Sequence, residues 1–326
     1  MSLNINYINN VIGCDPEIFF VKNNKVIPSS EVVPEHTDGY VIRDGFQGEL
    51  NPQAHTCRQS LSYWIGHSFL EAKRYADDVG AKISLDTGMI ISDDIWKKTP
   101  KELKRFGCNP TLNSHEKNFK RVTGVREKFR ALGGHIHLSL NDGTNEEELV
   151  ALLDIIVGNT CVLLDRDPNN ARRRKNYGRA GEYRIKRYGI EYRVLSAFWM
   201  KHYVLMSMVF AFARNAIAIQ YYGKAKELLS LFDMRKVRRA INNNDFELAK
   251  ENFNILMKFI KDNKAVGNGL SENRVDRFYE WATGSDPLVF CNTIEKTTKS
   301  WEDCHYSVPS GFERFIDNNT YKTIYD

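Results

Sequence analysis

The chain has 326 residues and a formal net charge of +5; 42% of its residues are apolar and 27% are charged. This composition, which includes 18 Phe and 15 Tyr, indicates a globular protein with a substantial core and excludes disordered, collagen-like and coiled-coil classes. The length fits one large domain or two ordinary ones. The six cysteines include no C-x-x-C pair, which argues against a zinc ribbon or a disulfide framework and fits a reducing cytoplasm. No signal peptide is expected, because no basic region precedes an apolar run near residue 1.

Short strand-like runs alternate with Gly, Asp and Asn in the first two hundred residues. Strands are predicted over residues 16–21, 25–28, 39–43, 46–51, 82–85, 134–140, 182–187 and 190–195. Two long helices are expected to interrupt them, at residues 57–81 and 146–164. The second begins with three glutamates, which the helix dipole favours in a first turn.

The remaining chain is predicted to be nearly all helix up to about residue 283. Apolar residues recur at helical spacing in 198–222, 224–232, 246–262 and 271–283, and the tail from Asp286 is expected to be irregular. Residues 198–222 are hydrophobic, but the longest stretch without charge is shorter than the ~20 residues that cross a bilayer, so a buried core helix is predicted. The class is α+β: a β-rich region over 1–197 and a helical supporting region over 198–326, integral to the same domain.

Ionisable residues spaced two apart on predicted strands are the most informative feature, because such residues share one face of a strand. The pairs are Asp15 and Glu17 in GCDPEIFF, Gln47 and Glu49 in FQGELNP, His135 and His137 in GGHIHLSL, Glu182 and Arg184 in GEYRIKR, and Glu191 and Arg193 in GIEYRVLS. A single pair is common on any strand with one wet face. Several strands carrying Glu, His and Arg are harder to explain that way, since solvated faces are usually built from Lys, Ser, Thr and Gln.

The chemistry open to these residues is that of a phosphoryl-transfer site. Carboxylates with an imidazole form a divalent-metal site, and Mg²⁺ or Mn²⁺ is preferred when carboxylates dominate. Arginines beside such metals neutralise phosphate and donate bidentate hydrogen bonds to it. The sequence has no Walker A, G-x-G-x-x-G or G-x-S-x-G motif. Any ATP would therefore bind on an open sheet through metals and arginines.

The segment 172–187 is strongly basic. It holds eight Lys and Arg residues against one acid, Glu182. An anionic neighbour such as a phosphate group or a nucleic acid is therefore expected there. A nucleic-acid-binding protein using this segment is one alternative, although it leaves the acidic pairs without a purpose. A metal-dependent phosphodiesterase or other hydrolase with the same ligands is another, and an inactive relative is a third.

These blocks resemble the carboxylate–amine (COOH–NH2) ligase superfamily with a glutamine-synthetase-like fold, and within it the phage-associated COOH–NH2 ligase type 2 family. The blocks are GCDPEIFF, DGFQGELNP, GGHIHLSL, RRRKNYGRAGEYR and GIEYRVLS, in the superfamily's order over roughly residues 13–196. GGHIHLSL resembles the metal-binding His strand of glutamine synthetases, and Glu191-x-Arg193 resembles their Glu-x-Arg pair. Asp15-Pro16-Glu17 departs from their Glu-x-Glu, and no block after residue 197 matches.

The resemblance implies a curved, mainly antiparallel sheet backed by helices, and ATP-dependent formation of an amide bond through an acyl phosphate. The divalent metals would be held by Glu17, Glu49, His135 and Glu191. The transferring phosphoryl group or the substrate carboxylate would be contacted by Arg174, Arg179 and Arg193, and the nucleotide phosphates by these and Arg184. Asp15 would add a ligand or help to deprotonate the amine, and His137 would orient the site.

The implied cofactors are ATP and Mg²⁺ or Mn²⁺. The expected partners are a small-molecule or peptide acid, such as glutamate or a peptide terminus, and an amine, which leaves ammonia, an amino acid, a polyamine or a protein side chain open. Neither a membrane nor a nucleic acid is expected as a partner, and oligomerisation is left open. The expected location is the cytoplasm, which would be that of the bacterial host for a phage-encoded protein.

Overall fold

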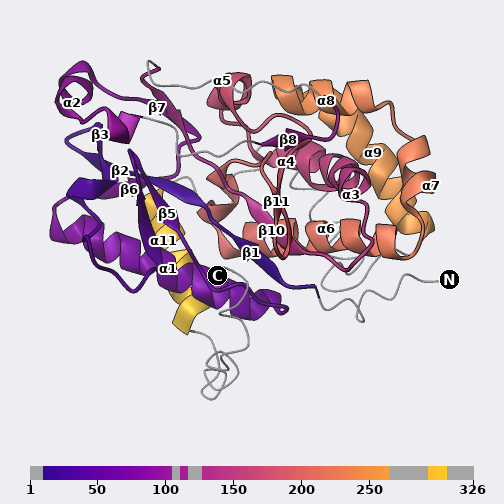
Figure 1. Ribbon diagram of the computed structural model, residues 1–326, viewed down its shortest axis with the longest axis horizontal. Coiled ribbons are helices and arrows are strands. Elements are labelled where there is room, and N and C mark those ends of the chain that lie inside the picture. The colour runs from indigo at the N-terminus through magenta and orange to yellow at the C-terminus, as the bar shows by residue number, and fades with distance from the viewer. Residues whose placement is uncertain (1–9, 105–110, 117–126, 264–292, 307–326) are drawn as a thin grey trace.

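Two antiparallel sheets and a layer of helices make up the fold in a computed structural model (Figure 1). The structure describes residues 10–104, 111–116, 127–263 and 293–306. Sheet B, with α1 and α11, lies on the left in Figure 1, and sheet A, with the helices from α3 to α9, lies on the right. The α+β class and the antiparallel strand pairing predicted from the sequence are confirmed, with two principal sheets in place of one.

Sheet A brings together strands from distant parts of the chain. Its order is β1 (Ile12–Cys14), β10 (Ile136–Ser139), β12 (Gly189–Tyr192), β11 (Glu182–Lys186) and β8 (Leu112–Asn113). In this register Glu191 lies opposite His137 on one side and opposite Arg184 on the other. Directly opposite residues of antiparallel strands project to the same face. An imidazole, a carboxylate and a guanidinium therefore form a row across sheet A.

Sheet B carries a second row of acids. Its order is β3 (Lys25–Ile27), β2 (Glu17–Lys22), β5 (Gln47–Leu50) and β4 (Val41–Asp44), and β6 (Lys82–Ser84) also pairs with β2. Glu17 lies opposite Glu49, and Asp44 lies opposite Gln47. Since residues two apart share a face, Glu17, Asp44 and Glu49 all project to the same side. A separate pair, β7 (Gly88–Ile90) and β9 (Phe129–Ala131), is joined to sheet B where Gln47 donates a hydrogen bond to the Ala131 carbonyl (3.0 Å).

The two sheets meet at Asp15-Pro16. β1 ends at Cys14 in sheet A and β2 begins at Glu17 in sheet B, so the chain changes sheets within two residues. Gly133, just before β10, holds this junction, because its carbonyl accepts from the Glu17 amide (2.8 Å) and its own amide donates to Glu17 Oε2 (2.6 Å). Asp15 thus directly follows a strand of sheet A, whereas Glu17, two residues later, begins a strand of sheet B.

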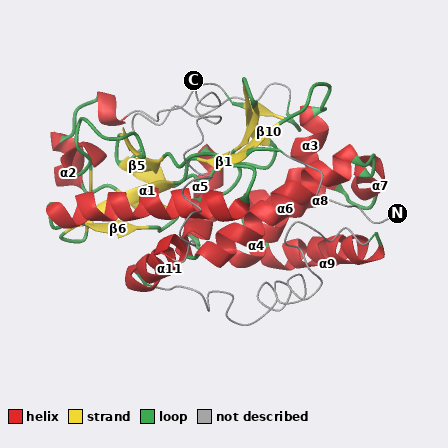
Figure 2. Ribbon diagram, turned by 90° about the horizontal axis from the view of Figure 1, so that it is seen from below, coloured by secondary structure: helices red, strands yellow, loops and turns green. Residues whose placement is uncertain are grey.

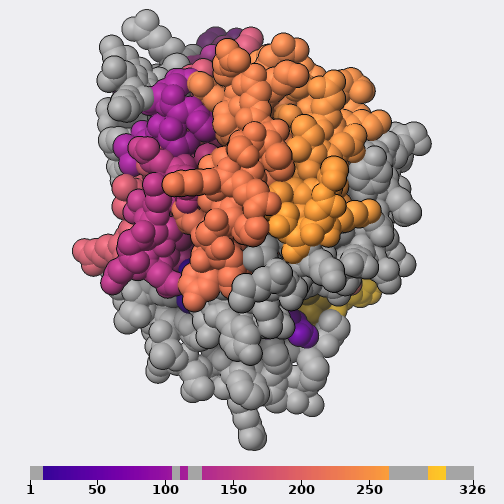
Figure 3. Space-filling model, turned by 90° about the vertical axis from the view of Figure 1, so that its right-hand side faces the viewer, coloured from indigo at the N-terminus to yellow at the C-terminus, as the bar shows by residue number. Residues whose placement is uncertain are grey.

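Helices pack against the sheets, mainly on one side of the strands (Figure 2). They are α1 (Arg58–Asp78), α2 (Asp93–Lys98), α3 (Glu146–Leu153), α4 (Asn159–Leu164), α5 (Asn169–Asn176), α6 (Tyr203–Tyr221), α7 (Ala225–Ser230), α8 (Met234–Asn243), α9 (Phe246–Asp262) and α11 (Ile294–Tyr306), with 3-10 turns at Ser29–Glu31, Glu102–Lys104 and Ala197–Lys201. α1 contacts β4, β5 and β6, and α11 packs along α1. The helices from α6 to α9, in orange in Figure 3, form much of the surface at the sheet A end.

α6 is the core helix predicted over 198–222. It is long and apolar enough to cross a membrane by length and composition, but 78% of its most apolar window is buried inside the protein. Its neighbours are α1, α3 and the π-helical turn at Asp154–Gly158. The first residues of the predicted helix form instead a 3-10 turn, Ala197–Lys201, and His202 caps α6 by accepting from the Val204 amide (3.1 Å).

A π-helical turn interrupts the helix predicted over 146–164. Asp154 opens this turn and is fully buried, and its carboxylate accepts from the Tyr192 hydroxyl (2.8 Å) and lies 2.7 Å from His115 Nε2. A side chain at Gly158 would lie 2.5 Å from the same hydroxyl. The turn therefore leaves room for the Tyr192 side chain. The hydrogen bond from Tyr192 to Asp154 fixes the position of β12 next to Glu191 and Arg193.

Every predicted strand is present, with ends that differ by up to three residues. Four short strands were missed: β1, β7, β8 and β9. Four helices were missed as well: α2, α5, α8 and α11. The prediction of an irregular tail from Asp286 was wrong over α11, which is anchored where Trp301 is buried and donates to the Met200 carbonyl (2.7 Å). The helix predicted over 271–283 lies outside the described residues. The boundary at residue 197 stays a prediction.

Gly134 is expected to tolerate no side chain. A Cβ there would lie 2.3 Å from the Ser196 carbonyl oxygen and 2.6 Å from the Trp199 indole nitrogen, and the first of these is backbone that cannot step aside. We expect Gly134→Ala to lower the free energy of unfolding by about 1–3 kcal/mol, the usual cost of overpacking a core. Urea unfolding measures it. Gly66→Ala in α1 is the control, since its Cβ would meet ordinary contacts of 3.4–3.5 Å. Equal stability of the Gly134 variant and the wild type would contradict the steric account.

Candidate active site

Two groups of potential metal ligands lie where the sheets meet. Within the described residues, Asp15, His135 and Glu191 form one group and Glu17, Asp44 and Glu49 form the other. In each group the ligand atoms lie within 4.8 Å of one another. We call them the sheet A group and the sheet B group, after the sheet that supplies most of each.

In the sheet A group, imidazoles surround one carboxylate. His135 Nδ1 lies 2.8 Å from Asp15 Oδ1 and 3.6 Å from Glu191 Oε1, and His137 Nε2 lies 3.2 Å from Asp15 Oδ2. Burial by itself raises the pKa of Asp15, but the two imidazoles outweigh it and hold that pKa well below its usual range. Asp15 is therefore an ionised carboxylate at neutral pH.

Glu191 is fully buried and touches three cations. Arg193 donates to its Oε1, while Arg184 donates to Oε2 (3.2 Å) and the Lys186 ammonium lies 3.0 Å from the same oxygen. Burial and Asp15 each raise the pKa of Glu191, but His135 and Arg193 bring it below its ordinary value. The carboxylate is thus ionised even though it is buried.

In the sheet B group the pKa values of the carboxyl groups are raised, whereas those of Asp15 and Glu191 are lowered. Among the described residues, none forms an ion pair with Glu17, Asp44 or Glu49. Burial and then the charge of Asp44 raise the pKa of Glu17 to about 8. Burial and the neighbouring acids likewise raise the pKa of Glu49 well above its ordinary range, and burial with Asp15 raises that of Asp44. Clustered carboxylates of this kind take up protons unless a cation joins them.

The two groups form one site. Asp15 raises the pKa of every member of the sheet B group, and Arg193 lowers the pKa of Glu17 and Asp44, so charges on one sheet are felt on the other. The residues fit a divalent cation. Carboxylate oxygens dominate, as Mg²⁺ and Mn²⁺ prefer, and His135 Nε2 is a buried nitrogen with no hydrogen-bond partner in the described part of the chain.

Most residues predicted for the site are brought together: Asp15, Glu17, Glu49, His135, Arg184, Glu191 and Arg193. His137 contacts Asp15, in keeping with an orienting position. Two predicted arginines are placed elsewhere. Arg174 is buried beneath α8 and donates to Asn244 Oδ1 (3.0 Å), and Arg179 lies near the surface with its guanidinium 3.8 Å from Glu116. Their predicted contacts with a phosphoryl group stay predictions.

Asp44 is the acid that the sequence reading missed. The predicted strands cover residues 39–43 and 46–51 and leave Asp44 between them, whereas in the structure β4 and β5 are joined by a two-residue turn that places Asp44 opposite Gln47. Since Gln47 and Glu49 share a face, recognising the two-residue turn would have placed Asp44 with Glu49. Lys186 was also missed as a site residue, although it follows Arg184 by two positions on the same strand.

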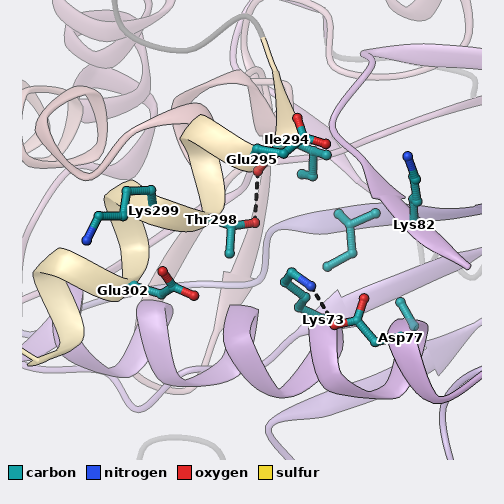
Figure 4. Close-up of a pocket in the computed structure, with 10 residues that line it drawn as sticks. Lys73, Asp77, Lys82, Ile294, Glu295, Thr298, Lys299 and Glu302 are labelled. Atoms are coloured by element: carbon teal, nitrogen blue, oxygen red, sulfur yellow. Dashed lines mark hydrogen bonds and ion pairs between the residues drawn. The ribbon is translucent and has the colours of Figure 1, made fainter.

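A cavity of about 340 Å³ lies apart from these acids, between α1, β6 and α11 (Figure 4). Figure 4 shows Lys73 and Asp77 of α1 on one side and Glu295 of α11 on another. Lys73 is paired with Asp77 (2.5 Å), and the lining mixes acids and lysines without a cluster of ligand atoms. Within the described part of the chain, the clusters of potential ligand atoms lie where the sheets meet.

The fold is α+β, and acids, histidines and arginines converge where its two antiparallel sheets meet. Residues 113–283, just over half of the chain, match the family model described as phage phiEco32-like COOH.NH2 ligase-type 2. The chain belongs to this family. A search of curated proteins finds no match.

The family match covers β10, β11 and β12 of sheet A and the helices from α3 to α9, and it leaves out β1, Asp15 and α11. It contains His135, Glu191 and Arg193, and it begins after the sheet B acids. It also runs through α6, α7, α8 and α9, where the sequence reading had found no matching block. The helical region is thus part of what the family shares, and the family resemblance predicted from the sequence is confirmed.

Proposed function

We propose that this protein is an ATP-dependent carboxylate–amine ligase that forms an amide or peptide-like bond at a Mg²⁺ or Mn²⁺ site. In this reaction the substrate carboxylate takes the γ-phosphoryl group of ATP to give an acyl phosphate, and an amine then displaces phosphate. The observation that carries the proposal is the meeting, at one junction, of two acid groups: the sheet B group, which forms no ion pair with another described residue, and the sheet A group, whose Glu191 contacts three cationic side chains. The family is named for the same bond.

The sheet B group would hold a divalent cation, with Glu17, Asp44 and Glu49 as its oxygen ligands. The sheet A group offers Asp15, His135 and Glu191 for a second. Bound there, the metal would neutralise phosphate charge and polarise the oxygens of the transferring group. Arg193 reaches both groups, since it touches Glu191 and its charge acts on Glu17. It is the guanidinium best placed to stabilise charge that develops on a phosphoryl group.

The basic segment 172–187 does not form one surface. Arg173 and Arg174 are buried, with Arg173 donating to the Val194 and Leu195 carbonyls (2.8 and 2.6 Å), while Arg184 and Lys186 turn to Glu191. This distribution gives a nucleic-acid backbone no continuous track within the segment. The hydrolase alternative uses the same ligands, so an experiment must separate it from the ligase.

The substrates and the setting belong to the proposal. The acid would be an amino-acid carboxylate or a peptide terminus, and the amine ammonia, an amino acid, a polyamine or a protein side chain. The work would take place in the cytoplasm, which suits the free thiols of Cys14, Cys57, Cys161 and Cys304.

The deciding experiment follows ADP release with purified protein, ATP and Mg²⁺ or Mn²⁺ across a matrix of acids and amines. A ligase releases ADP and phosphate only where one acid and one amine are both present, and mass spectrometry then finds a product equal to their sum less one water. ADP or AMP release that ignores both substrates would favour the hydrolase. No nucleotide turnover in any combination would count against the ligase.

A further inference from the structure

Tyr177 contacts two residues of the candidate active site. It directly follows α5 and is 9% exposed. Its ring is nearly perpendicular to the His135 imidazole, with 5.5 Å between the centroids, and the Arg193 guanidinium lies over the same ring, 5.3 Å from its centroid. A potential metal ligand and the arginine that reaches both acid groups therefore share one aromatic neighbour.

The Tyr177 ring restricts how the Arg193 guanidinium can turn. Arg193 is 2% exposed and donates to Glu191 Oε1. A hydrogen bond to one carboxylate oxygen still allows the guanidinium plane to rotate, whereas an aromatic ring against its face limits that rotation. Cation–π contacts are also stronger where water is excluded. Glu191 and Tyr177 together thus set both the place and the orientation of this guanidinium.

α5 holds Tyr177 against the backbone that carries Arg193. The Arg173 guanidinium also lies over the Tyr177 ring, 4.6 Å from its centroid, and the Tyr177 amide donates to the Arg173 carbonyl (2.9 Å). Arg173 itself donates to the Val194 and Leu195 carbonyls (2.8 and 2.6 Å). The ring is therefore fixed relative to the two residues that follow Arg193.

The hydroxyl end of Tyr177 reaches the junction of the two sheets. A Cβ at Gly133 would lie 2.2 Å from the Tyr177 hydroxyl oxygen and 2.6 Å from His135 Nε2. Gly133 is the residue whose amide donates to Glu17 Oε2 (2.6 Å). Tyr177 thus extends from the Arg193 guanidinium to the backbone that joins sheet A to sheet B.

We propose that Tyr177 is a positioning residue, whose ring holds the Arg193 guanidinium and the His135 imidazole in the arrangement that phosphoryl transfer requires. The reaction that it serves rests on the proposed ligase function, but the contacts do not. Arg193 would act on charge that develops during transfer. Loss of the ring should therefore lower kcat and leave the KM for ATP nearly unchanged.

A purely structural role for Tyr177 makes a different prediction. If Tyr177 only filled the core, Tyr177→Leu would lower the free energy of unfolding and leave Arg193 as well ordered as before. Tyr75→Leu is the matched control. Tyr75 is a buried tyrosine of α1, the Arg74 guanidinium lies 4.6 Å from its ring centroid, and it belongs to neither acid group.

Proton exchange of the Arg193 Nε–H group with water provides the first test, measured by NMR on the isotope-labelled, metal-free full chain. A buried arginine N–H exchanges slowly, and the loss of its signal in Arg193→Lys assigns it. Tyr177→Leu should speed this exchange about tenfold, the effect of losing one desolvated cation–π contact. Tyr177→Phe keeps the ring and should exchange as the wild type does, and so should Tyr75→Leu.

Steady-state kinetics, with ATP and the acid–amine pair that supports ADP release, provide the second test. In Tyr177→Leu, kcat should fall about tenfold to a hundredfold, while the KM for ATP stays within about twofold of the wild-type value. Tyr177→Phe should restore kcat. A Phe variant as slow as the Leu variant would show that the ring is not the positioning group.

Unchanged Arg193 exchange in Tyr177→Leu would overturn the positioning role, and so would rapid exchange in the wild type. Should Tyr177→Leu fail to fold, Tyr177→Met decides, because Met is a long, flexible side chain without a ring. The two proposals fail separately. Slow exchange that depends on the Tyr177 ring, without any nucleotide turnover, would remove only the ligase. Turnover with exchange and kcat unaffected by Tyr177→Leu would remove only the positioning role.

Discussion

Glu49→Gln is expected to abolish the stabilisation of this protein by Mn²⁺. In the wild type, ion binding to the folded state should raise the free energy of unfolding by about 2.7 kcal/mol when Mn²⁺ reaches a hundred times its dissociation constant. The variant loses a carboxylate charge from a group of three that share no ion pair with another described residue. An amide oxygen is a weaker ligand for a hard cation, so the shift should vanish at the same Mn²⁺ concentration.

Thermal melting with and without Mn²⁺ measures this effect, and ATP-dependent turnover should fall by at least about a hundredfold, since charge stabilisation supplies most of phosphoryl-transfer catalysis. Glu251→Gln is the matched control, because Glu251 is an exposed glutamate on α9 and should keep the whole Mn²⁺ shift. A Glu49 variant that responds to Mn²⁺ as the wild type does would show that the sheet B group is not where the ion binds.

Strand periodicity could predict most of the site. Once residues two apart are assigned to one face, Glu17, Glu49, His135 and Glu191 follow from short runs whose apolar neighbours mark the other face. That reasoning is local. It cannot say that the chain leaves one sheet just before Asp15 and enters another at Glu17, because this depends on hydrogen bonds between Glu17 and Gly133, more than a hundred positions away.

The basic segment 172–187 shows that the local sequence does not predict which partner each arginine contacts. Arg172, Arg173 and Arg174 are consecutive and chemically alike, yet Arg173 supports the β12 exit through backbone carbonyls, Arg174 reaches α8, and Arg172 pairs with Glu127 (3.0 Å) at the surface. The three arginines have different surroundings because they lie on α5, and consecutive residues of a helix point in different directions. α5 has no apolar stripe that would have marked it as a helix in the sequence. Periodicity predicts neither that helix nor its packing.

α8 differs from α5, because its sequence does contain apolar residues at helical spacing. Val237, Ala240 and Ile241 have the spacing of a buried helical face and are buried in the structure, but basic residues around them obscured the pattern. No pattern of apolar residues predicts the π-helical turn at Asp154. It depends on Tyr192 and His115 converging on one carboxylate from other parts of the chain.

In metal-free protein, Glu17 should make stability fall as pH rises. Its pKa is raised from 4.5 to about 8 by burial and then by Asp44. Below about pH 4.5 the carboxyl is protonated in both the folded and the unfolded chain, so it does not change the free energy of unfolding. Between about 4.5 and 8 the unfolded chain releases the proton and the folded chain keeps it, so the free energy of unfolding declines by about 1.4 kcal/mol for each pH unit.

Glu17→Gln removes this titration while its amide oxygen can still accept from the Gly133 amide. The variant should therefore equal the wild type near pH 4.5 and become more stable than it by a few kcal/mol near pH 8, measured by urea unfolding in EDTA. The same substitution removes a charge that raises the pKa of Glu49, which adds to the difference in the same direction. Glu251→Gln should run parallel to the wild type at every pH. A difference between Glu17→Gln and the wild type that stays constant with pH would mean that Glu17 is already ionised in the folded protein, because a proton held by the buried acid group requires the two curves to diverge.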